Sequence, residues 1–171
     1  MPEPGQLISN PITGEQIVFR RTAAETGGEL LEFDVELRPG GVIAGFPHRH
    51  PQTERFRVTS GRLVGWIQGR GAVSYGTGQQ FTIQPNLDHL LGNGAAARTR
   101  ARVVIRPPDR FDEFFETVFQ LSAGRRPGGL SRIAATRRAL ALAREIRLTP
   151  SIVPEFVQRR LTGADHRDER A

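Results

Sequence analysis

Short segments of alternating apolar and polar residues follow one another from Glu15 to Arg106, and turns rich in glycine separate them. The clearest segment runs from Leu31 to Arg38, where an apolar residue alternates with a charged one. A period of two is the pattern of a strand with one face in the core and the other in water. Six more segments have strand patterns: 55–60, 63–68, 72–75, 81–83, 89–91 and 97–106. Many short strands at such close spacing predict a β-sandwich or a β-barrel.

The pattern changes after Pro107 and Pro108, where an apolar stripe at i, i+3, i+4 and i+7 predicts a helix capped by Asp109. The stripe consists of Phe111, Phe114, Phe115 and Val118. Four large apolar side chains exposed together would form a patch that monomers avoid, so we expect the stripe to cover the barrel or a partner subunit. A second helix is predicted over about 130–146, and a shorter one near 154–161 that ends at Gly163.

These patterns divide the chain into four parts. We expect an N-terminal arm at 1–14, broken by three prolines, then a barrel at 15–107, a helical extension at 108–163 and a disordered tail at 164–171. The first residues lack the basic start and apolar core of a signal peptide, and no apolar run approaches the roughly 20 residues of a membrane span. The expectation is therefore a cytoplasmic protein with no membrane partner.

The basic residues of this chain are all arginine, and they give a net charge of +6. Since lysine is absent, Schiff-base catalysis is excluded; since cysteine is absent, disulfides and thiolate ligands are excluded as well. The positive charge is spread evenly, because residues 1–106 and 107–171 each carry 12 arginines and 9 acidic residues. We therefore expect no nucleic-acid partner.

Three of the four histidines fall in the strand region between Glu15 and Arg106. In an extended segment the side chains at i and i+2 share a face, so His48 and His50 should point the same way and Arg49 the other. A short turn over 51–53 could bring the Glu54 carboxylate back to that face, and His89 could supply a third imidazole. Imidazole and carboxylate together suit Fe, Mn, Ni, Cu or Zn. His166 lies in the polar tail and receives no role.

The spacing of these residues resembles the two motifs of the cupin superfamily. The first motif is matched by His48, His50, Glu54 and Gly61, with three residues between His50 and Glu54 and six before Gly61. The second is matched by Gly78, His89 and Asn93 at the family's spacing, with Gln84, Pro85 and Asn86 in the place of the family's Pro-x-Gly. Two positions depart from it: Gln84 stands where the family has proline, and Asn86 where it has glycine. Asparagine tolerates the positive φ that such a turn requires better than most residues.

The resemblance implies a fold and a metal site. The fold is a mainly β, double-stranded β-helix, the cupin jelly-roll barrel, here with a C-terminal helical extension. In such barrels the two imidazoles of His-x-His, the glutamate and the later histidine bind one divalent transition metal, which assigns that role to His48, His50, Glu54 and His89. Four protein ligands on an octahedral metal leave two positions open for water, O₂ or substrate.

The alternation also predicts an apolar pocket without an inward arginine that could hold a phosphate. Its expected lining is Phe46, Gln52, Phe56, Val58, Ile67 and Leu91. The hypothesis is a mononuclear non-haem oxygenase acting on a small apolar or aromatic molecule. Two alternatives stay open. One is a metal-dependent isomerase, cyclase or lyase in which Glu54 acts as a base; the other is a cupin that binds a small molecule without catalysis.

Two further predictions concern the outer faces of the sheets. Val64 and Trp66 alternate with inward residues and should face outward, where a partner subunit in a homodimer or the C-terminal helices of the same chain would cover them. Outward positions of 31–38 carry the acidic residues Glu32, Asp34 and Glu36, and outward positions of 97–106 carry Arg98, Arg100 and Arg102. Because the resemblance places these two strands side by side, we expect arginine–carboxylate pairs between them.

Overall fold

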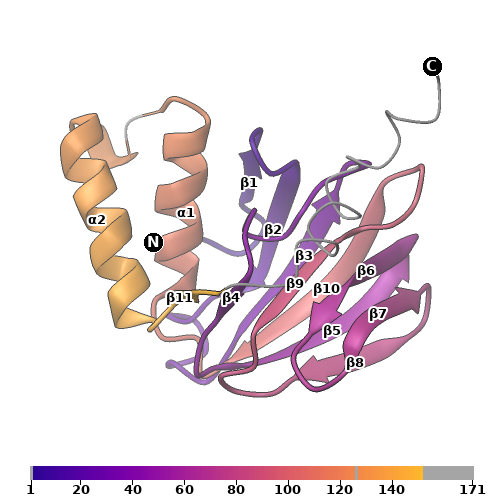
Figure 1. Ribbon diagram of the computed structural model, residues 1–171. Coiled ribbons are helices and arrows are strands. Elements are labelled where there is room, and N and C mark those ends of the chain that lie inside the picture. Colours follow the sequence, from indigo (N-terminus) through magenta and orange to yellow (C-terminus); the bar gives the residue numbers. More distant parts are fainter. Residues whose placement is uncertain (1, 126, 152–171) are drawn as a thin grey trace.

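The computed structural model describes residues 2–125 and 127–151, which form two antiparallel sheets and two helices (Figure 1). The six-stranded sheet has the order β1 (Leu7–Asn10), β2 (Glu15–Arg21), β3 (Leu31–Leu37), β10 (Thr99–Arg106), β5 (Thr53–Ser60), β8 (Gln80–Ile83). The five-stranded sheet has the order β11 (Thr149–Pro150), β4 (His48–Arg49), β9 (His89–Asn93), β6 (Arg62–Ile67), β7 (Gly71–Gly76). The predicted mainly β jelly-roll fold with a C-terminal helical part is thus confirmed.

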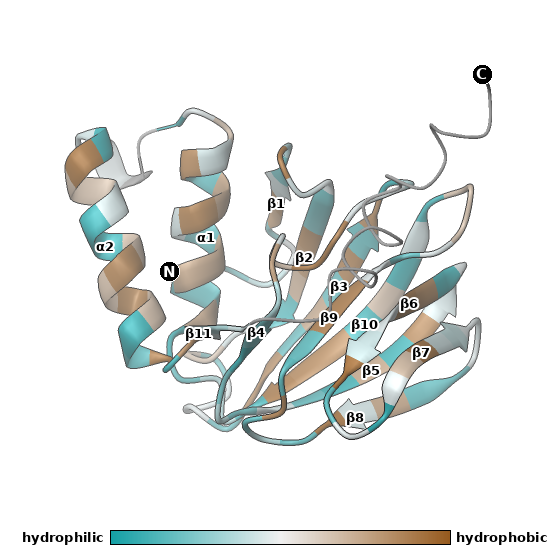
Figure 2. Cartoon of the chain, viewed as in Figure 1, coloured by the Kyte–Doolittle hydropathy of each residue, from teal (hydrophilic) through white to brown (hydrophobic). Residues whose placement is uncertain are grey.

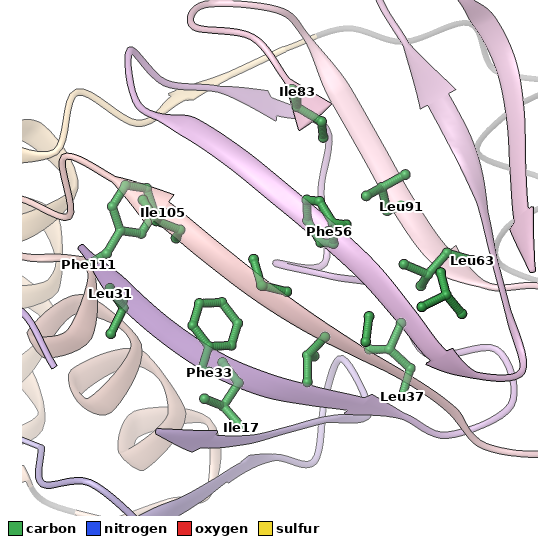
Figure 3. Packing of buried hydrophobic residues seen from close by; sticks show 14 of the residues in the cluster. Ile17, Leu31, Phe33, Leu37, Phe56, Leu63, Ile83, Leu91, Ile105 and Phe111 are labelled. Atoms are coloured by element: carbon green, nitrogen blue, oxygen red, sulfur yellow. The ribbon is translucent and has the colours of Figure 1, made fainter. Parts of the chain in front are cut away.

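The alternation in the sequence determines which side chains of each strand are buried in the core and which lie at the surface. In β3 every second side chain is buried and its neighbours are partly exposed, and the strands carry alternating apolar and polar bands in Figure 2. The inward side chains of both sheets meet in one hydrophobic core, in which Phe33 and Phe56 are almost completely buried (Figure 3). Burial of such side chains stabilises the fold by roughly 1.5–3 kcal/mol each.

The outer face of the six-stranded sheet carries the expected charge pairs. β3 and β10 are neighbours, and Arg102 lies opposite Asp34 in their register. Arg98 and Arg100 each lie 2.6 Å from a different oxygen of Glu36, and Arg102 Nε lies 2.8 Å from Asp34 Oδ1. The prediction is confirmed, and each exposed pair contributes under about 1 kcal/mol.

The apolar stripe after Pro108 lies on helix α1 (Phe111–Ser122), which packs on the barrel beside α2 (Arg132–Glu145) (Figure 1). Phe111 is buried, the other three stripe residues pack against the core, and the ring of Phe115 lies 5.5 Å from that of Phe33. The expectation that the stripe covers the barrel is confirmed. The predicted cap is wrong: Arg110 is the N-cap residue and no side chain caps the helix, because Asp109 has φ 43° and accepts a hydrogen bond from Gln52 instead.

The segment expected to be an irregular arm contains β1, which pairs with β2. The prolines at 2, 4 and 11 lie outside this strand, so its ladder of hydrogen bonds with β2 is free to form. The turn that follows is held by the Asn10 carboxamide, whose oxygen accepts the N–H groups of Ile12 and Thr13. The helix predicted near 154–161, the tail at 164–171 and His166 lie outside the described residues. No helix in the described part of the chain is long and apolar enough to cross a membrane.

Candidate metal centre

The three strand-region histidines and Glu54 come together inside the barrel from both sheets. β4 pairs with β9 so that His48 lies opposite His89, and the alternation of β4 turns His48 and His50 inward while Arg49 points outward. Glu54 belongs to β5 of the facing sheet and is also buried. The four residues are between 2% and 6% exposed, so the cluster is isolated from bulk water.

The side chains converge on one small volume. One ring nitrogen each from His48, His50 and His89 can be chosen so that all lie within 4.8 Å of one another. The Glu54 carboxylate lies beside them, with Oε1 3.4 Å from His50 Nε2 and Oε2 3.6 Å from His89 Nε2. Three imidazoles and a carboxylate form a donor set typical of divalent transition metals.

Backbone carbonyl groups orient two of the imidazoles. His48 Nδ1 lies 2.9 Å from the carbonyl oxygen of Phe46, and His89 Nδ1 lies 2.8 Å from that of Leu87. Because a carbonyl oxygen only accepts hydrogen bonds, each Nδ1 must carry the proton. Each Nε2 is then left with a free lone pair, as metal-ligating histidines require.

Buried nitrogen atoms without a partner provide a test of whether these residues fit a metal. Both ring nitrogens of His50 and Nε2 of His89 are buried and have no hydrogen-bond partner. Leaving a buried polar atom unsatisfied costs roughly 1–3 kcal/mol, and such atoms are rare in proteins. A cation accepting the Nε2 lone pairs would remove the cost at His89 Nε2 and at one nitrogen of His50, so the residues fit a bound metal.

Burial keeps the imidazoles of His48 and His89 neutral, and the Glu54 carboxylate stays charged. Loss of hydration lowers the pKa of His48 to about 3, and it is also the main cause that lowers the pKa of His89. For Glu54 burial raises the pKa, but the interaction with His50 outweighs it, and the net pKa is lowered to about 2. At neutral pH these groups are therefore in the protonation states that bind metals.

The helical extension closes the metal centre from one side. The ring of Phe111, the first residue of α1, lies 5.1 Å from the ring of His50 in an edge contact. The Gln52 side chain donates a hydrogen bond to Asp109, and β11 pairs with β4 so that Pro150 lies opposite His48. Both ends of the helical hairpin are thus attached next to the metal centre.

Access to a bound metal should depend on Phe111. Replacing it with alanine removes the ring that covers His50, so metal loss from the loaded protein to a chelator should become faster. Phe114→Ala is the matched control, because Phe114 lies on the same helix and contacts Phe111 and Phe115 but not His50. Since Phe→Ala in a core can cost about 3–5 kcal/mol, Phe111→Leu serves as a milder variant. Equal chelation rates in all four proteins would contradict this role of Phe111.

The expected pocket residues occupy different environments. Phe56 lines a small internal cavity of about 10 Å³ that also borders Glu54, a volume that holds about one water molecule. Val58, Ile67 and Leu91 are at most 1% exposed and belong to the core, while Gln52 is buried and bound to Asp109. Phe46 was expected to point inward but is 37% exposed, because it lies in the irregular loop before β4 rather than in a strand.

Sequence reasoning missed the groups that orient and cover the histidines. The carbonyl groups of Phe46 and Leu87 could not be found, since every residue has one. Phe111 was assigned to the barrel surface, and nothing in the helical period indicates that its first position reaches His50. The turn at Asn86 was anticipated: its φ is 62°, and its N–H donates to the His50 carbonyl oxygen over 2.8 Å.

Comparisons with known proteins agree with this architecture. A family model described as a cupin domain matches residues 33–105. A predicted oxalate decarboxylase from Thermotoga maritima is 19% identical, with a TM-score of 0.51 over 59% of this chain and 90% of that chain. A cupin-like protein from the same organism is 23% identical, with a TM-score of 0.50 over 62% and 79% of the two chains.

A sugar phosphate isomerase of the cupin superfamily from Silicibacter pomeroyi is 24% identical, with a TM-score of 0.46. That alignment covers 54% of this chain and spans 59% of the isomerase. A search of curated proteins found no match. At these identities the likenesses show the fold alone.

Proposed function

Because residues 33–105 place this chain in the cupin superfamily, we propose that it is a mononuclear metalloenzyme whose divalent transition metal is held by His48, His50, Glu54 and His89. The observation that carries the proposal is the cluster of three buried imidazoles with unpartnered nitrogens beside a buried carboxylate. With four protein ligands, a bound metal has positions left for Lewis-acid or oxygen-activating chemistry.

We assign the reaction to the oxygenase type and the substrate to small apolar or aromatic molecules. The surroundings of the imidazoles support this substrate class: the ring of Phe46 lies 5.6 Å from that of His48, and Phe111 and Phe56 are close by. Every arginine in the described residues is exposed, so none is placed inside the barrel to bind a phosphate or a sugar acid.

The chain's own residues perform three tasks in this proposal. The Phe46 and Leu87 carbonyl groups fix the tautomer and orientation of His48 and His89. Glu54 supplies a negative charge that compensates part of the cation's charge. The apolar side chains of Phe56 and Phe111 exclude water, which strengthens the electrostatic interactions at the centre.

The test begins with metal analysis of protein purified without a chelator. About one equivalent of Fe, Mn, Ni, Cu or Zn is expected, followed by oxygen consumption when the loaded protein meets a panel of small aromatic and apolar compounds. His50→Ala is the control for both measurements. Stoichiometric metal without oxygen consumption would contradict the oxygenase assignment while keeping the metal site. Conversion of a compound without oxygen would then point to Lewis-acid chemistry.

A further inference from the structure

The five-stranded sheet has an apolar outer face that α1 and α2 do not cover. Leu90 of β9 points outward and is only 4% exposed, and among the described residues its apolar neighbours are Val42, Val64 and Trp66. Trp66 lies opposite Leu90 in the register of β6 and β9, as the sequence predicted for an outward position. We call these four residues the outer patch.

The last described residue lies on the same face as this patch. Asp88 and Leu90 flank the inward His89, and side chains at i and i+2 share a face of a strand. The Ser151 hydroxyl donates to Asp88 Oδ1 over 2.8 Å, and the Ser151 N–H donates to the Pro47 carbonyl oxygen over 2.9 Å. Two residues of a strand span about 7 Å, so Asp88 and its hydrogen-bond partner Ser151 lie close to Leu90.

We propose that residues 152–161 of this chain pack on the outer patch. This segment follows Ser151 directly and contains Ile152, Val153, Phe156, Val157 and Leu161. Its sequence favours a helix beginning at Pro154, with Val157 and Leu161 four residues apart on one face and Phe156 beside them. The ten residues 152–161 begin beside Asp88, and they are long enough to reach Trp66 whether they are extended or helical.

Tethering favours this occupant over a second copy of the chain. A segment held at the edge of its binding surface has an effective concentration in the millimolar range. A second copy would have to cover about 800 Å² per subunit to form a stable interface, whereas the outer patch consists of four side chains. The segment also contains aliphatic and aromatic side chains, the same types that form the outer patch.

Fluorescence tests the proposal because Trp66 is the only tryptophan of the chain. In full-length protein, Phe156→Asp should shift the emission of Trp66 to longer wavelength and increase its quenching by acrylamide. Gln158→Asp introduces the same charge on the side of the predicted helix opposite Phe156 and should change neither. Circular dichroism confirms that both variants remain folded. An emission that is unchanged in Phe156→Asp would overturn the proposal.

A cross-link separates the two occupants, since the natural chain has no cysteine. In full-length protein carrying Val64→Cys and Val157→Cys, oxidation should form a disulfide within one chain, which requires the two Cα atoms to lie within about 7 Å. A disulfide that joins two chains, together with a dimeric mass of the wild type in light scattering, would overturn the proposal and assign the outer patch to a homodimer interface.

Discussion

His50→Ala is expected to abolish stoichiometric metal binding and, with it, the stabilisation that metal gives to the wild type. His50 has two unpartnered buried nitrogens and lies 3.4 Å from Glu54, so its removal takes one ligand from the centre and leaves the carboxylate less compensated. A metal present at 100–1,000 times its dissociation constant stabilises the folded state by about 3–4 kcal/mol. Thermal unfolding with added metal and with chelator should therefore differ for the wild type and coincide for the variant.

Comparing each protein with itself, with and without metal, removes the cost of the cavity that alanine leaves in the barrel. His166→Ala is the matched control, because it removes an imidazole from the one histidine outside the cluster and should retain metal and its stabilisation. If His50→Ala still bound one equivalent of metal, the four-residue site would be wrong.

The sequence predicted the barrel through local periodicity, and it predicted the histidine cluster through the resemblance to the cupin motifs. Alternation in β3 and β10 determines which side chains face the core, and the same rule turns His48 and His50 inward with Arg49 outward. The charge pairs between these two strands needed one more fact, the strand order, which the family motifs supplied. The burial pattern and the charge pairs require only knowledge of the neighbours within a strand or across a strand pair.

Features that depend on contacts distant in sequence were missed. β4 and β11 have two residues each, so they carry no periodic pattern, and they form only because His48 lies between His89 and Pro150. Aspartate is a common N-cap residue, but the carboxylate of Asp109 accepts a hydrogen bond from Gln52, which lies 57 residues earlier in the sequence. Phe46 follows the hydrophobic pattern yet lies in a loop, where alternation does not apply.

Glu15 is a buried carboxyl group that the metal centre does not use. It is 2% exposed, and its Oε2 accepts the Ala44 N–H over 3.1 Å. Burial raises its pKa to about 7, and the hydrogen bond from Ala44 offsets only part of this effect. Sequence reasoning placed Glu15 at the start of the barrel and gave it no role, since the alternation of β2 has to be known before the residue is seen to face inward.

The raised pKa makes the stability of the fold depend on pH. Below the ordinary glutamate pKa of 4.5 the group is protonated in both states and contributes nothing to this dependence. Between 4.5 and about 7 the folded state keeps the proton that the unfolded state has lost, so the free energy of unfolding falls as pH rises. Above about 7 the full cost of the buried charge is present, on the order of 3 kcal/mol.

Glu15→Gln should therefore stabilise the protein at about pH 8 by up to about 3 kcal/mol and have little effect near pH 4. The amide cannot ionise, but it can still accept the Ala44 N–H, so the hydrogen bond is retained. Urea unfolding in the presence of chelator measures the difference between variant and wild type at each pH, which cancels the titration of the histidines.

Glu36→Gln is the control of opposite sign. Burial raises the pKa of Glu36, but Arg100 and Arg98 together outweigh it and lower the pKa overall. The ionised Glu36 carboxylate therefore adds to the free energy of unfolding above the ordinary glutamate pKa. The Glu36→Gln variant should lose stability at neutral pH rather than gain it. If Glu15→Gln and wild type differed by the same amount at about pH 5 and about pH 8, Glu15 would not titrate in this range, and the buried carboxyl group would be ionised throughout.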